Sequence, residues 1–174
     1  MKVKIITDCA EVVTLTEVKN WLKVTGTQDD DLIEDIMIPA ARQTLEKFTG
    51  ASFGEKTIEV LFTTWEAFYK LPYGPVTEVT KVERVYTDGT ETELDSDDYT
   101  VREDQVYVSE WYSTRELVGV RITYTAGYND DEVMPVMLKE AVLNQISYNY
   151  DNRENGGISP AAMHKCQPYK RFWV

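Results

Sequence analysis

The sequence predicts an α+β fold: a small helical bundle with an inserted antiparallel β subdomain. Apolar residues recur at steps of three and four over residues 14–50 and again over residues 134–153, the period of a helix packed on one face. Residues 56–128 change to a period near two and are rich in Val, Ile, Thr and Tyr, as in half-buried strands. We therefore expect an N-terminal helix pair and one long C-terminal helix, with the strands between them.

The first helix begins at a capping signal. Thr14 and Glu17 have the spacing of a capping box, in which each side chain binds an unpaired backbone amide of the first turn. A short helix should follow, to about Val24. Its predicted apolar face consists of Leu15, Val18, Trp21 and Leu22.

A longer helix is predicted from about Asp29 to Phe48, ended by Gly50 where a left-handed residue is favoured. Pro39 lies inside this run, where it lacks an amide donor and its ring crowds the preceding turn. We expect one bent helix rather than two helices. The predicted apolar face consists of Ile33, Ile36, Met37, Ala40, Ala41, Leu45 and Phe48.

The β region should contain several short strands joined by turns. Asp88-Gly89 is typical of a tight hairpin between two of them. Trp111 and Tyr112 lie in the segment 109–116, which we expect to be a loop. The predicted strands are residues 57–62, 79–86, 91–94, 99–102, 106–108 and 118–124.

The last long helix is predicted from near Pro135 through Tyr150, with the proline acceptable in the first turn. Gly156-Gly157 then ends the helix or forms a hinge, and Ser159-Pro160 begins one more helical turn. We expect residues 1–157 to form a single domain and residues 158–174 to form a C-terminal docking tail.

Composition and charge exclude several classes of function. The net charge of −12 opposes nonspecific binding to the phosphate backbone, because such binding depends on Lys and Arg. No stretch approaches the roughly 20 apolar residues that cross a bilayer, and the start of the chain does not resemble a signal peptide. Cys9 and Cys166 are far apart in the sequence, which favours reduced thiols in a cytosolic setting.

The carboxylates between Asp29 and Asp35 suggest a cation site, because hard cations prefer clustered oxygens. However, acidic residues in a first helical turn also complement the helix dipole, and the run lacks the glycine and glutamate of a calcium loop. We favour the dipole interpretation here, and simple solvation for Asp95, Asp97 and Asp98.

No grouping typical of catalysis is found in the sequence. His164 is the single histidine, and its neighbour Cys166 lies two positions away, where two helical side chains do not face each other. Neither a phosphate-binding glycine loop nor a GxSxG turn is present. We therefore predict a non-enzyme with no catalytic, cofactor or metal residues.

The end of the chain combines aromatic residues with cations after a proline. Tyr, Trp and Arg dominate the energetics of many interfaces, so this segment is a candidate partner-docking site. Packing on its own domain is the alternative. The candidate residues are Tyr169, Lys170, Arg171, Phe172 and Trp173, with Trp111 and Tyr112 as a secondary contact loop.

The sequence resembles the head-to-tail connector (adaptor) proteins of tailed bacteriophages, in the group with a β-rich insertion between N- and C-terminal helices. The resemblance covers most of the chain. It rests on the order and spacing of four stretches more than on any single stretch. These stretches are TLTEVKNWLKVTGTQDDDLIEDIMIPAARQTLEKFTG, LPYGPVTEVTKVERVYTDG, YTAGYNDDEVMPVMLKEAVLNQISYNYDNRE and PYKRFWV.

The resemblance implies a structural subunit of a ring, expected to be twelvefold, that continues the DNA channel from the portal protein to the stopper or tail-completion protein. It implies a location at the head–tail interface of the virion after assembly in the host cytoplasm, and DNA that passes without specific binding. Docking would fall on residues 159–174, with Tyr169, Lys170 and Arg171 matching best, whereas Pro39 departs from the usual continuous helix.

Two other functions remain open at this point. A metal-dependent hydrolase would use the carboxylates from Asp29 to Asp35. A monomeric peptide-binding module would use exposed strand edges of the β region.

Overall fold

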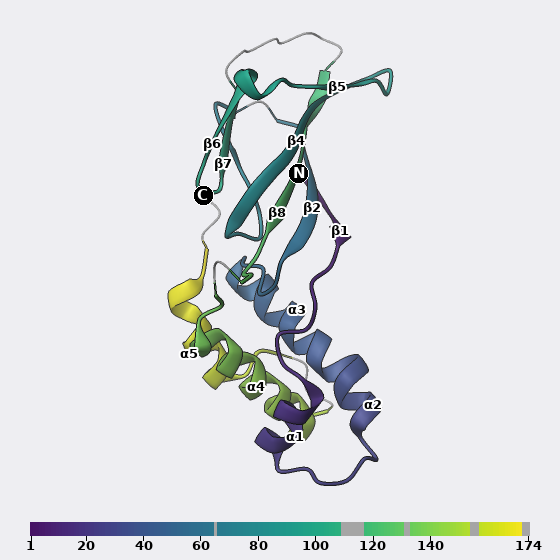
Figure 1. Ribbon diagram of the computed structural model, residues 1–174, viewed down its shortest axis with the longest axis vertical. Coiled ribbons are helices and arrows are strands. Elements are labelled where there is room, and N and C mark those ends of the chain that lie inside the picture. The colour runs from purple at the N-terminus through teal and green to yellow at the C-terminus, as the bar shows by residue number, and fades with distance from the viewer. Residues whose placement is uncertain (65, 109–116, 131–132, 154–156, 172–174) are drawn as a thin grey trace. The chain divides into compact units, whose positions relative to one another are not determined.

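The computed structural model describes every residue except 65, 109–116, 131–132, 154–156 and 172–174. Its contacts divide the chain into two compact units (Figure 1). Of the described residues, the β unit comprises Met1–Asp8 and Glu55–Gly127, and the helical unit comprises Cys9–Gly54 and residues 128–171. None of the helices among the described residues has the length and apolarity to cross a bilayer.

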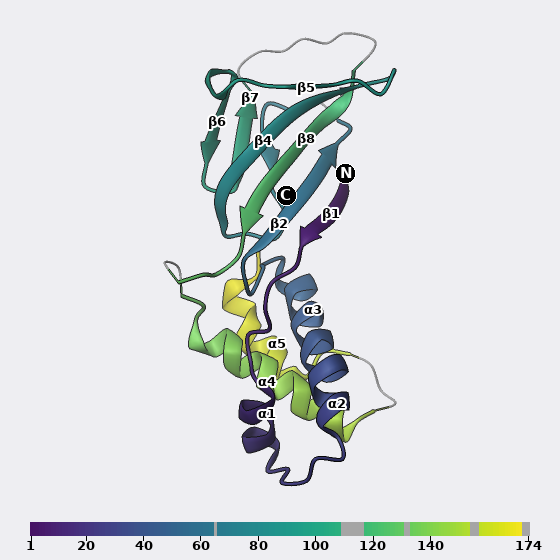
Figure 2. The same ribbon diagram turned by 45° about the vertical axis from the view of Figure 1, so that its right-hand side comes forward.

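The β unit contains two antiparallel sheets (Figure 2). The five-stranded sheet has the order β1-β2-β8-β4-β5, with β1 Lys2–Thr7, β2 Lys56–Phe62, β8 Leu117–Ala126, β4 Val76–Tyr86 and β5 Glu91–Glu93. The three-stranded sheet has the order β3-β7-β6, with β3 Tyr69–Lys70, β7 Gln105–Val108 and β6 Tyr99–Arg102. A short 3₁₀ turn, Ser96–Asp98, precedes β6.

One core is shared by both sheets of the β unit. Buried and half-buried residues alternate strictly along β2, because successive residues of a strand point to opposite faces of the sheet. Every second side chain of β2 therefore points into the core. The five-stranded sheet contributes Ile58, Val60, Val120, Ile122 and Tyr124, and the smaller sheet with its flanks contributes Tyr69, Leu71 and Val106. The Tyr124 hydroxyl donates a hydrogen bond to the Pro72 carbonyl, so this buried polar group is satisfied.

The predicted strands are confirmed, and two further strands are present. Strand β1 was not predicted, and all six of its residues are exposed. Strand β3 has only two residues. The hairpin at Asp88-Gly89 is confirmed: Gly89 has φ 86°, and the Tyr86 amide donates to the Thr90 carbonyl at 3.0 Å. The expected loop with Trp111 and Tyr112 lies outside the described residues.

The helical unit contains α1 Leu15–Leu22, α2 Asp30–Leu32, a π-helical turn Ile33–Met37, α3 Ile38–Thr49, α4 Val136–Asp151, α5 Pro160–Cys166 and a 3₁₀ turn Gln167–Tyr169. The capping box of α1 is confirmed in both directions: the Glu17 amide donates to the Thr14 hydroxyl, and the Thr14 amide donates to the Glu17 carboxylate. Glu17 also accepts from Lys139 of α4 at 2.6 Å. This bond and those to Thr14 lower the pKa of Glu17.

The helical run around Pro39 is continuous, as predicted, but its irregularity is a π-helical turn. The Ile38 amide donates to the carbonyl of Ile33, five residues earlier. Pro39 then lies in the first turn of α3, where a missing donor has little cost. The wider π turn gives the chain a place to accommodate the proline without ending the helix.

The π turn also explains an error in the predicted apolar face. Ile33, Met37, Ala41 and Leu45 are buried, but Ile36 is 58% exposed and Ala40 is exposed. A regular period of 3.6 residues, counted through a turn with one additional residue, assigns the wrong side chains to the core. Trp21 of α1 is likewise exposed rather than buried.

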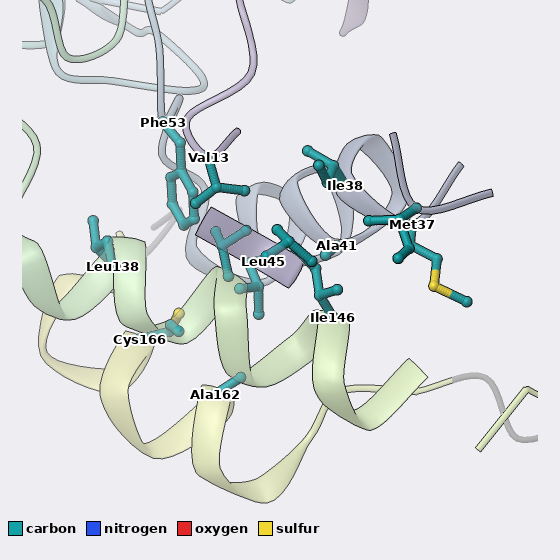
Figure 3. Packing of buried hydrophobic residues seen from close by; sticks show 14 of the residues in the cluster. Val13, Met37, Ile38, Ala41, Leu45, Phe53, Leu138, Ile146, Ala162 and Cys166 are labelled. Carbon is teal, nitrogen blue, oxygen red and sulfur yellow. The ribbon is translucent and has the colours of Figure 1, made fainter. Parts of the chain in front are cut away.

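Helices α3, α4 and α5 share the core of the helical unit (Figure 3). Leu45 of α3, Leu138 and Ile146 of α4, and Cys166 of α5 are fully buried in one cluster. The predicted final helix is confirmed, with Pro135 just before its first residue. The short helix after Ser159 is also confirmed, and the Ser159 side chain caps it by accepting from the Ala162 amide.

Candidate docking site and its anchoring

Helix α5, at the start of the predicted docking tail, is an integral part of the helical core. Ala162 and Cys166 on its inner face have no exposed surface. On its outer face, Met163 is 41% exposed and His164 is exposed. Lys165 pairs with Glu140 of α4 at 2.8 Å. The tail expected from residue 158 therefore begins with a helix that the domain needs for its own packing.

A buried glutamine fixes the segment that leads into α5. The Gln145 side-chain amide donates to the Gly157 carbonyl and to Asn149, each at 2.8 Å. Its carbonyl oxygen accepts from the Ser159 amide at 2.8 Å. Both ends of the carboxamide are thus satisfied, which is what a buried polar group requires. The expected hinge at Gly156-Gly157 has one described residue, Gly157, and that residue is anchored by Gln145.

The described part of the candidate docking residues lies against the C-terminal end of α3. Tyr169 packs against the helical core, and the Lys170 ammonium lies 4.5 Å from the centre of the Phe48 ring. The Arg171 amide donates to the Thr49 carbonyl at 2.7 Å. Phe172, Trp173, Trp111 and Tyr112 lie outside the described residues, so the docking role of all these side chains stays a prediction.

The carboxylates from Asp29 to Asp35 are divided among different partners. Asp30 pairs with Lys19 of α1 at 2.6 Å. Asp29 accepts from the Tyr150 hydroxyl of α4 at 2.7 Å, and this bond raises the pKa of Tyr150. The described residues contain no group of three or more side chains placed to hold a metal ion. These contacts connect the N-terminal end of the long helical run to α1 and to α4.

Sequence reasoning missed a buried ionic network in the helical unit. Arg42 is 2% exposed and binds the Glu11 carboxylate through Nε and Nη2, each at 2.9 Å. Its Nη1 binds Glu46 at 3.1 Å, and Glu46 also accepts from the Phe53 amide at 2.9 Å. The four-residue spacing of Arg42 and Glu46 was a visible signal, whereas Glu11 lies 31 positions away.

A groove of about 460 Å³ lies on the helical unit, beside the π turn. Its lining includes the apolar side chains of Leu32, Ile36, Met37 and Ala40 and the polar side chains of Asn149, Asn152 and Arg153. Among the described residues that line the groove, Arg153 is the titratable one.

His164 and Cys166 do not form a nucleophilic pair. The histidine is exposed on the outer face of α5, and the cysteine is fully buried on the inner face. Burial raises the pKa of the Cys166 thiol to about 11, so the reactive thiolate is scarce at neutral pH.

We expect Cys166 to react with Ellman's reagent at pH 8 at least tenfold more slowly than Cys9, which is only half-buried. Rates measured on Cys9→Ser and Cys166→Ser separate the two thiols. Denaturant should make both rates equal, and equal rates in the folded protein would contradict the burial of α5.

The free energy of unfolding should also decrease as pH rises from about 9 toward 11, because the Cys166 thiol ionises at a lower pH in the unfolded chain than in the folded one.

The described residues of the candidate site thus make structural contacts within the helical unit, and the terminal segment is anchored there. The chain matches the head completion protein family over residues 11–159 and belongs to that family. It is therefore a structural protein of head completion. No curated protein matches it.

Solved structures share the fold along nearly the whole chain. A chain from "Neck of empty GTA particle computed with C6 symmetry" is 21% identical, with TM-score 0.79, covering 100% of this chain and 97% of that chain. A chain from "Virion of native gene transfer agent (GTA) particle" is also 21% identical, with TM-score 0.76 and the same coverage. A third, from "Neck of native GTA particle computed with C12 symmetry", is 20% identical, with TM-score 0.65, covering 95% and 96%.

Proposed function

We propose that this chain is the subunit of a ring at the head–tail interface of a virion, between the portal protein and the stopper or tail-completion protein. The observation that carries the proposal is the family membership over residues 11–159. The likeness in fold to chains from the neck of a particle, one described with C12 symmetry, supports a twelvefold ring. The chain would assemble in the host cytoplasm and act without catalysis.

The charge of the chain suits a conduit for DNA. With a net charge of −12, most of the surface repels phosphate, so DNA can pass through a ring of such subunits without adhering. No specific contact with DNA and no membrane contact is part of this function.

The end of the chain is the proposed portal-docking element. Because α5 and residues up to Arg171 are anchored on the helical unit, docking would fall on Phe172 and Trp173, with Lys170 and Arg171 beside them. Two aromatic side chains that directly follow two cations suit an acidic, partly apolar pocket on a partner. Trp111 and Tyr112 are the proposed secondary contact.

Mixing the purified chain with the portal ring of the same genome should produce a new annular layer on one face of the portal, visible by negative-stain microscopy. The chain alone at high concentration is the control for spontaneous rings. Free chains beside unchanged portals would contradict the proposed function and favour a monomeric peptide-binding module.

The same assay tests the docking segment. Truncation after Gly157 is unsuitable, because it would remove the buried Ala162 and Cys166 from the helical core. Truncation after Arg171 retains every described contact of the segment, and we expect it to preserve the melting temperature while reducing portal binding at least tenfold. Portal binding equal to that of the full chain would contradict docking by Phe172 and Trp173.

A further inference from the structure

The two edges of the five-stranded sheet differ in charge. Strand β1 forms one edge, and residues 1–7 carry Lys2 and Lys4 with no acidic residue. Strand β5 forms the other edge, and residues 88–98 carry six acidic residues with no Lys or Arg. Lys2, Lys4, Glu93 and Asp95 are all exposed. A single sheet thus presents a basic edge and an acidic edge.

The β1 edge also exposes apolar side chains that continue the core face of the sheet. Val3 is opposite Val60 and Ile5 is opposite Ile58, and both partners on β2 are fully buried. Residues opposite each other on neighbouring strands share a face. Nevertheless, Val3 is 38% exposed and Ile5 is 47% exposed. Among the described residues, β1 pairs with β2 alone, so its other edge has open backbone groups.

We propose that the β1 edge of one copy docks on the β5 edge of a second copy, which deepens the proposed function by naming a contact between ring subunits. Lys2 and Lys4 would then face Glu93 and Asp95 of the next copy, and Val3 and Ile5 would lose water-exposed apolar surface. An exposed strand edge is a template for pairing with another chain.

Charge selects the arrangement of the two copies. Two β1 edges would bring lysines together, and two β5 edges would bring carboxylates together, so both two-fold arrangements are disfavoured. The β1–β5 contact joins different surfaces and is therefore heterologous, the type that closes into a ring. Since all neighbours in the sheet are antiparallel and the strands number five, β1 and β5 run in the same direction, and every subunit would repeat one orientation.

Charge reversal and its compensation test the contact. Lys2→Glu with Lys4→Glu, or Glu93→Lys with Asp95→Lys, should each weaken self-association at least tenfold in sedimentation velocity. All four changes in one chain should restore association, because every heterologous contact again joins opposite charges. Lys23→Glu with Lys47→Glu, both exposed on the helical unit, is the matched control and should leave association unchanged.

Disulfide trapping tests the same contact on the assembled particle. Lys4→Cys with Glu93→Cys, two positions on the same face of the sheet, in a Cys9→Ser background, should give a ladder of cross-linked copies when the chain is bound to portals. A layer on the portal without cross-links, and with no effect of charge reversal, would overturn this inference while the proposed function stands. If portals recruit no chain, the proposed function fails, and sedimentation of the free chain decides the inference. A wild-type chain that neither binds portals nor self-associates contradicts both.

Discussion

Replacing Arg42 by alanine should lower the free energy of unfolding of the helical unit by about 3–5 kcal/mol, the range for removing one partner of a buried ion pair. Arg42 is 2% exposed and forms an ion pair with Glu46, whose side chain is 4% exposed. The substitution would remove this positive charge from the buried Glu46 carboxylate, which also accepts from the Phe53 amide. It would also release Glu11, which joins the segment before α1 to α3.

Denaturant unfolding followed by helical circular dichroism measures this loss. Arg153→Ala is the matched control, because that side chain is 54% exposed and lies 3.7 Å from Asp29, and it should cost less than about 1 kcal/mol. Glu46→Gln in the Arg42→Ala background should recover part of the loss by removing the unpaired charge. A loss for Arg42→Ala no larger than that of the control would show that the network contributes little.

Replacing Gly119 by alanine should destabilise the β unit by about 3 kcal/mol, at the upper end for overpacking. A Cβ at this position would lie 2.0 Å from the Phe62 carbonyl oxygen and 3.2 Å from the Thr63 Cα. Both are backbone atoms, so no side chain can rotate away. Strands β2 and β8 would have to separate next to the paired Phe62 and Val120.

Hydrogen exchange measured by mass spectrometry follows the two units separately. Peptides from β2 and β8 should lose protection in Gly119→Ala, whereas peptides from α3 and α4 should be unaffected. Gly26→Ala is the control, because its Cβ would meet nothing within 4 Å, and it should change stability by less than about 0.5 kcal/mol. Unchanged protection of β2 in Gly119→Ala would contradict the close approach of these strands.

Features set by neighbouring residues were predictable from the sequence. The capping box of Thr14 and Glu17 and the Gly89 turn are local, and both are present in the structure. Features that depend on distant partners were not predictable. The exposure of Ile36 follows from a π turn that no simple periodicity contains, and β1 becomes a strand only because β2 offers it an edge.

The candidate site shows the same division. The aromatic and basic composition of the final residues is visible in the sequence, but their anchoring depends on Thr49 and Phe48, about 120 residues earlier in the chain. The burial of Cys166 and the bonds of Gln145 to the start of α5 likewise result from packing between α4 and α5. Composition therefore indicated a contact segment, and tertiary structure determines which of its residues are available.

The Gln145 carboxamide has a mechanical consequence. Because one side chain of α4 bonds both Gly157 and Ser159, tension applied at the end of the chain reaches α4 through two short hydrogen bonds as well as through the covalent connection. The load is shared by a sixteen-residue helix instead of being concentrated on the connection alone. In the docking role that we propose for the end of the chain, a load on the docked segment would therefore pass into the helical core.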